Sequence, residues 1–187
     1  MKWVQPESLR DEASHRRRQL AVQGNRILNA AASRIRGFEL EVQAIPVEGL
    51  TLRGSLARLD AKYKDFFGDI YSTGTPVDAT FLRIRRAPRW TWDARASYEN
   101  EVGPGTLMAN AELHMIGAHE LTFLNNPNLR NAAQYLLDAS ISYKINKTMI
   151  SVFGKNLADE NGYTIGYDVQ NVWSYGAPRP PRQWGVA

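Results

Sequence analysis

Apolar and polar residues alternate with a period of two along most of the chain after residue 34. In the segment 35–44, for example, Phe38 and Leu40 alternate with Glu39 and Glu41. Successive side chains of an extended strand point to opposite faces, so this pattern predicts strands with one apolar and one polar face. The other alternating segments are 50–63, 89–98, 107–115, 137–144, 150–155 (where Phe153 falls on the polar side) and the short 183–186.

The connections between these strands alternate between short and long. The short ones are turns of Gly, Pro and Asn at 46–49, 103–105 and 146–147, and the long ones span 64–87, 117–134 and 156–181. Bacterial membrane barrels place short turns at one rim and long loops at the other. We therefore expect an all-β fold, an antiparallel meander of transmembrane-type β-hairpins that forms a partial, open outer-membrane barrel of about seven strands.

The alternation also predicts which side chains share a face. The expected lipid-type, convex face holds Phe38, Leu40, Trp90, Trp92, Leu107, Leu113, Ile141 and Val152. The expected concave face holds Glu39, Glu41, Arg53, Asp93, Arg95, Glu112 and Ser140. Aromatic residues near strand ends, as at Trp90 and Tyr98, are typical of a membrane–water boundary. A soluble β-rich ligand-binding module has the same period of two and stays open as the alternative.

The first part of the chain has a different composition. Residues 7–23 are rich in Arg, Glu, Gln and Ala, which favours helix, but their apolar positions are sparse. We expect residues 1–33 to be a leader, either a weak helix or disordered, and residues 34–187 to hold the barrel strands. The first residues are too polar for a secretory signal, so we expect either a chain that is not exported or a piece of something longer.

Composition excludes several kinds of chemistry. The chain has no cysteine, and it has no run of 18 apolar residues that could form a transmembrane helix. The formal net charge of +4 comes largely from two Arg clusters that lie in no nucleic-acid-binding motif. Glu112 and His114 share a face but lack a third metal ligand. We expect no enzyme, no cofactor, no metal site and no nucleic-acid partner.

Several segments resemble the C-terminal strands of TonB-dependent outer-membrane receptors. They are RIRGFELE at 34–41, GLTL at 49–52 with LDAKYKDF at 59–66, APRWT at 87–91, FGKNLAD at 153–159, and PR at 178–179 with WGV at 184–186. Each is weak alone, but the five occur in the family's order and spacing over about residues 25 to 187. The family usually has Asn-Leu-Thr-Asp near its end and an aromatic last residue, whereas this chain has Asn-Leu-Ala-Asp and Ala187.

The resemblance implies an outer-membrane receptor for iron-siderophores, vitamin B12, haem or sugars, with an N-terminal plug and a barrel of twenty-two strands. We therefore expect an incomplete fragment whose partners are outer-membrane lipid, the missing plug and strands, and a small-molecule chelate. Arg83, Arg85 and Arg86 lie in an expected outer loop and are the candidate ligand-binding residues, for an anionic ferric chelate or lipopolysaccharide phosphates.

Overall fold

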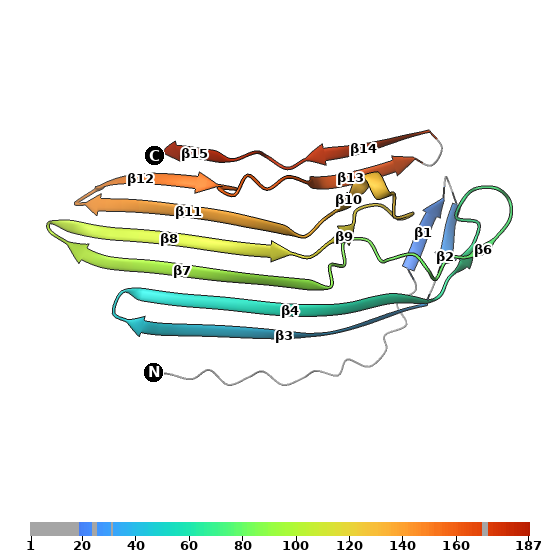
Figure 1. Cartoon of the computed structure of the whole chain (residues 1–187), viewed down its shortest axis with the longest axis horizontal. Helices are drawn as coiled ribbons and strands as arrows, with labels where there is room; N and C mark the ends of the chain where they lie inside the picture. The colour runs from blue at the N-terminus through green and yellow to red at the C-terminus, as the bar shows by residue number, and fades with distance from the viewer. Residues whose placement is uncertain (1–18, 24–25, 31, 170–171) are drawn as a thin grey trace.

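The computed structural model describes residues 19–23, 26–30, 32–169 and 172–187. Its main body is an antiparallel sheet of seven strands in the order β15-β12-β11-β8-β7-β4-β3 (Figure 1). The strands are β3 (Ala32–Val47), β4 (Leu50–Asp65), β7 (Trp90–Val102), β8 (Gly105–Ile116), β11 (Gln134–Ile145), β12 (Thr148–Lys155) and β15 (Gln183–Val186). Within the described residues, β3 and β15 each pair on one side only, so the sheet is open and the predicted meander is confirmed.

The strand register places the two predicted sets of side chains on opposite faces. Residues directly opposite each other in an antiparallel pair share a face. Leu56 of β4 lies opposite Trp92, and Trp92 lies opposite Met115 of β8. Arg53 lies opposite Arg95, which lies opposite Glu112. Following the register across the sheet puts all eight predicted apolar residues on one face, the apolar face, and all seven polar ones on the other, the polar face.

The apolar face is exposed, which a soluble sandwich does not allow. Val42, Ile141 and Val152 are 55%, 51% and 47% exposed. In a sandwich these side chains would pack against a second sheet about 10 Å away. The five longest strands have 12 to 16 residues, more than the roughly 9–11 that a tilted strand needs to cross a bilayer.

Aromatic side chains border the apolar face at both ends. Near the long loops, the Phe38 and Trp90 rings meet edge to face at 6.0 Å, and those of Trp92 and Tyr135 at 6.3 Å. Near the short turns lies Tyr98, eight residues after Trp90 on β7. Eight residues of strand span about 26 Å, or roughly 20 Å along the membrane normal for a usual tilt of about 40°, which falls within the roughly 25 Å apolar band of a membrane barrel.

The three short turns lie at one end of the sheet, the turn rim, and the long connections lie at the other, the loop rim (Figure 1). This arrangement confirms the predicted sidedness. The β7–β8 and β11–β12 turns are centred on Gly103-Pro104 and Asn146-Lys147. The β3–β4 turn is shorter than predicted, because β3 runs through Val47, and Gly49 there adopts a φ of +79°, which favours glycine.

The long connections contain regular structure of their own. Short paired strands are β5 (Phe67–Gly68) with β6 (Val77–Asp78), β9 (His119–Glu120) with β10 (Arg130–Asn131), and β13 (Tyr163–Val169) with β14 (Trp173–Pro178). A 3₁₀ helix, η1, spans Pro127–Leu129. A buried apolar cluster, the loop core, consists of Tyr63, Phe66, Ile70, Ala79 and Leu82. Phe123 of the next connection packs on it, with its ring 5.6 Å from that of Phe66.

Asp78 stabilises the turn beside the loop core. Its carboxylate accepts hydrogen bonds from the backbone N–H of Thr80 at 2.9 Å and from the Thr80 hydroxyl at 2.7 Å. These bonds favour the charged form and hold the pKa of Asp78 below its usual value.

Residues 19–30 differ from the prediction. The expectation of a weak helix or a disordered leader does not hold over 19–23, where β1 (Gln19–Gln23) pairs with β2 (Arg26–Ala30). Helix propensity is a weak preference that strand pairing readily overrides. The rest of the expected helix lies outside the described residues, and the division at residues 33 and 34 stays a prediction, although β3 begins slightly earlier, at Ala32. No helix in the described ranges is long and apolar enough to cross a membrane.

Candidate functional site at the loop rim

Three long connections meet around a hollow at the loop rim. The hollow has a volume of about 340 Å³. Its lining consists of Arg86 and Pro88 before β7, Ile116 at the end of β8, His119, Leu121 and Asn131 between β8 and β11, and Tyr163, Thr164 and Arg179 between β12 and β15. Residues far apart in the sequence meet here because the chain comes back to this rim each time it has run down one strand and up the next.

Gln134, at the start of β11, fixes one wall of this hollow. Its side chain is only 1% exposed, and its Nε2 donates to the Asn161 carbonyl at 2.8 Å. Its Oε1 accepts a hydrogen bond from Arg179 Nη2 at 3.1 Å, which positions the guanidinium. Gly162 packs directly against this amide, because a Cβ at that position would lie 1.9 Å from Gln134 Nε2.

Asn131 connects the second and third loops, and His119 contacts it from within the second. The Asn131 side chain donates to the Tyr163 carbonyl at 2.8 Å and accepts from the Tyr163 N–H at 3.0 Å, as a neighbouring strand would. His119 Nδ1 lies 2.9 Å from the Gly117 carbonyl, and its Nε2 lies 3.3 Å from Asn131 Nδ2. These contacts assign the hydrogen to Nδ1 and leave Nε2 as an acceptor.

The structure separates the three predicted basic residues. Arg86 lines the hollow, and its backbone N–H donates to the Glu120 carbonyl at 2.8 Å. Arg83 instead lies with Nη1 4.0 Å from Oε1 of Glu120, a buried carboxylate that also has Arg130 Nε at 3.4 Å. Arg85 is exposed and lines neither this hollow nor the one described below.

Arg86 is the one lining residue that was predicted, and Arg179 is the basic residue of this hollow that sequence reasoning missed. The prediction placed Arg179 in the approach to the last strand, where the Pro-Arg pair contributed only to the family resemblance. Its approach to Arg86 depends on a return of the chain that no local pattern encodes. The proline-rich stretch that follows was the one signal that this segment is extended.

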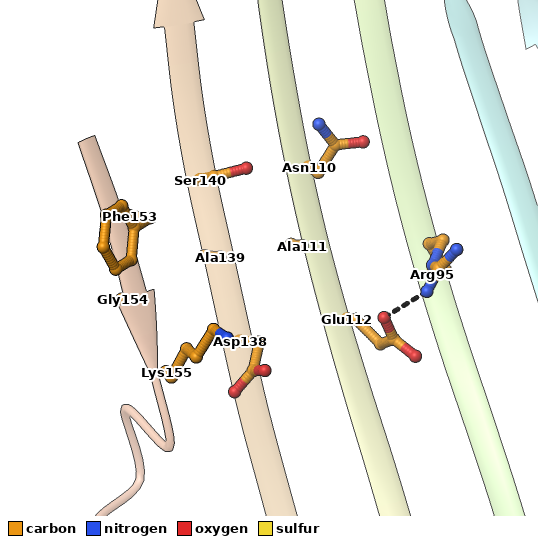
Figure 2. A pocket seen from close by; sticks show the side chains of 10 residues that line it. All are labelled: Arg95, Asn110, Ala111, Glu112, Asp138, Ala139, Ser140, Phe153, Gly154 and Lys155. Carbon is orange, nitrogen blue, oxygen red and sulfur yellow. Dashed lines mark hydrogen bonds and ion pairs between the residues drawn. The ribbon is translucent and has the colours of Figure 1, made fainter. Parts of the chain in front are cut away.

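A second hollow, of about 380 Å³, lies on the polar face in the middle of the sheet (Figure 2). Arg95 of β7 and Glu112 of β8 point toward each other there and form an ion pair. Asp138 of β11 accepts a hydrogen bond from the Asn156 N–H at 2.8 Å, and Lys155 of β12 borders the same space. This face therefore presents charged and hydrogen-bonding groups, as the interior of a membrane barrel does.

The chemistry available at the loop-rim hollow is recognition of an anion. Guanidinium groups such as those of Arg86 and Arg179 present planar forks of N–H donors that match carboxylate, phosphate and other oxyanions. Among the residues that the structure describes, no group of three His, Asp or Glu side chains could hold a metal ion.

An open antiparallel sheet with strands of this length, an exposed apolar face between aromatic borders and a charged opposite face defines a segment of transmembrane β-barrel wall. The chain belongs to the TonB dependent receptor-like beta-barrel family, whose model matches residues 10–172. The resemblance seen in the sequence is thereby confirmed.

Two solved structures share this fold. The ferric yersiniabactin uptake receptor FyuA from Yersinia pestis superposes with a TM-score of 0.72 and 20% identity over 88% of this chain. The siderophore receptor PiuA from Acinetobacter baumannii superposes with a TM-score of 0.64 and 18% identity over 89% of it. The matches cover 24% and 23% of those two proteins, so this chain spans about a quarter of their length.

Proposed function

We propose that the chain is a C-terminal part of the wall of an outer-membrane receptor that takes up iron-siderophores or a similar large nutrient. The observation that carries the proposal is the basic hollow at the loop rim, which three loops build above a wall with one lipid-type and one polar face. The family supports a receptor rather than an enzyme, and the two similar structures are an uptake receptor and a siderophore receptor by name.

The hollow suits one anionic part of a ligand. Arg86 and Arg179 supply positive charge, and the Tyr163 and Leu121 side chains supply apolar surface beside it. Its volume lies at the lower end of the roughly 300–1,000 Å³ that is usual for ligand sites. The rest of a large chelate would contact other parts of a complete receptor. Arg85 has no contact with this space, so we assign it no ligand.

The proposed partners follow from the open sheet. Outer-membrane lipid would cover the apolar face, and a plug and further strands would complete the polar interior. The edges at β3 and β15 present backbone groups ready to pair with another strand. The chain by itself would therefore aggregate or require detergent, and it would not transport.

Binding to the purified chain in neutral detergent tests the ligand. Because this chain supplies every residue of the hollow, Trp fluorescence can be titrated with an anionic ferric tris-catecholate and a neutral ferric tris-hydroxamate. We expect the wild type to bind the anionic chelate more tightly than the neutral one. The Arg86→Ala/Arg179→Ala variant should bind the anionic chelate roughly 10- to 100-fold more weakly, because each lost charge-assisted hydrogen bond is worth about 1.5–3 kcal/mol and part of that energy is screened by solvent. Arg85→Ala/Lys147→Ala, which removes the same charge away from the hollow, is the matched control. Equal affinities for the two variants would contradict the assignment of the hollow.

Fractionation tests the class of protein separately. Expressed with a signal peptide, the chain should enter the outer-membrane fraction and leave it only with detergent. A monodisperse protein that stays soluble without detergent would instead favour the soluble binding module.

A further inference from the structure

A basic patch lies on the outer side of β3 and β4, just beyond the aromatic border at the loop rim. Arg34 lies opposite Lys62, Arg36 opposite Asp60, and Phe38 opposite Arg58, which in turn lies opposite Trp90. The register places all of these residues on the same face of the sheet as Phe38 and Trp90. The four basic residues, here called the outer basic patch, therefore belong to the apolar face rather than to the hollow.

The strand register gives the height of the patch. Asp60 and Lys62 lie two and four residues beyond Arg58, which shares its row with Trp90. These steps correspond to about 7 and 13 Å along the strand, or roughly 5 and 10 Å along the membrane normal for a usual tilt of about 40°. The headgroup layer adds roughly 5–8 Å to each side of the hydrocarbon core. Arg58 and Arg36 thus lie at the level of lipid headgroups, and Arg34 and Lys62 lie just above it, where their long side chains can reach down to the same layer.

The patch carries more positive charge than its own acid can neutralise. Asp60 contacts Lys62 Nζ at 3.1 Å and Arg34 Nη2 at 3.4 Å. Arg36 and Arg58 form no ion pair within the described residues, and the Arg58 guanidinium lies 5.4 Å from the centre of the Trp90 ring. The Arg34 Nε is buried and has no hydrogen-bond partner there. Four cations beside one carboxylate leave the exposed guanidinium donors of Arg36 and Arg58 available to an anion.

We propose that the outer basic patch binds the phosphate groups of lipid headgroups in the leaflet next to the loop rim. The inference rests on the membrane placement proposed above. Arg forks match phosphate geometry, and basic residues close to an anionic membrane surface strengthen attachment. The patch faces away from the hollow, so the two basic sites serve different ligands: the hollow a solute and the patch the surrounding lipid.

Lipid binding by the chain in neutral detergent tests the proposal. The probes are diphosphorylated lipid A and the same lipid without phosphates, with bound lipid counted by native mass spectrometry. We expect Arg36→Ser/Lys62→Ser to bind diphosphorylated lipid A roughly 25-fold more weakly, about fivefold for each charge removed. Arg85→Ser/Lys147→Ser, with the same charge change elsewhere, should bind like the wild type. Arg36→Lys/Lys62→Arg keeps the charge and should retain most of the affinity, which excludes a folding defect.

Several results would overturn the proposal. They are equal binding by the two serine variants, equal binding of the two lipids by the wild type, or displacement of lipid A by an equal concentration of inorganic phosphate. Partition of the wild type into phosphatidylcholine vesicles separates the two levels of inference. If the wild type partitions into the vesicles but binds the two forms of lipid A equally, the patch alone is defeated. If it does not partition at all, the membrane placement is defeated as well.

Discussion

Replacing Ala94 with arginine tests whether the apolar face contacts lipid. The row that contains Ala94 runs through Val42, Gly54, Leu113 and Leu137. Ala94 lies four residues from Trp90 and four from Tyr98 along β7, so it is about 13 Å from each aromatic border. This position is the middle of the predicted apolar band, where a charge has the longest path to water.

The depth of a residue in the apolar band sets the expected free-energy cost of inserting a charged side chain there. An arginine on the lipid face of a membrane barrel costs about 2–4 kcal/mol at the midplane and about 0–1 kcal/mol near the interface. Ala109 lies opposite Tyr98 in the aromatic row, and Ala57 lies on the polar face opposite Thr91. We therefore expect Ala94→Arg to lower the vesicle partition coefficient roughly 30- to 700-fold. Ala109→Arg should lower it less than about fivefold, and Ala57→Arg should change it little.

The assay is titration of the detergent-diluted chain with phosphatidylcholine vesicles, followed by the blue shift of tryptophan emission. Trp90 and Trp92 lie on the apolar face, so their emission reports insertion directly. The three variants make the same change of residue type, and only face and depth differ. A cost at Ala57 equal to that at Ala94, or a larger cost at Ala109, would refute the assignment of the faces.

Three further predictions concern the rims and loops. Because the chain has no cysteine, Asn146→Cys at the turn rim and Asn128→Cys at the loop rim each create a unique thiol. In intact cells an impermeant maleimide should label only the Asn128→Cys variant. Labelling of both variants, or of Asn146→Cys alone, would contradict the topology. Glu120→Gln removes a buried charge that faces Arg83 and Arg130, and should destabilise the loops locally by about 1–3 kcal/mol, seen as faster hydrogen exchange over 83–86, while exchange in β8 stays unchanged. Because the pKa of Asp78 is lowered in the folded protein, the charged carboxylate contributes its full stabilisation of the loop above about pH 4 and loses it as pH falls through the lower folded pKa. The wild type should therefore resist proteolysis better than Asp78→Asn at neutral pH, and this difference should vanish in that acidic window.

The sheet could be predicted because its determinants are local. A period of two assigns each side chain to a face, and a shift of one residue would reverse every assignment, so the pattern excludes odd shifts and the short turns fix the rest of the register. Even Phe153, which breaks the alternation in β12, lies on the polar face where the count placed it, opposite Ser140. Short turns at residues such as Gly103-Pro104 then fixed the order and direction of the strands.

The loops could not be predicted in the same way. Gln134 contacts Asn161 and Arg179, which lie 27 and 45 residues later, and nothing in the intervening sequence has a period that reports these contacts. The short strands β13 and β14 were expected only as part of a long loop. The site therefore depends on long-range contacts, and the sequence identified Arg86 without Arg179, which lines the same hollow.

The loop core lies outside the band that lipid would cover, whereas the sheet below it has no buried apolar cluster among the described residues. Water thus drives the packing of Tyr63, Phe66 and Leu82, while the strands bury their apolar side chains only when a bilayer or detergent surrounds them. The loops and the strands of the same chain are consequently stabilised by different solvents, water for the loops and lipid or detergent for the strands. Urea or heat should act first on the loops, and exchange of the detergent should act on the strands, so a single melting temperature would describe neither part.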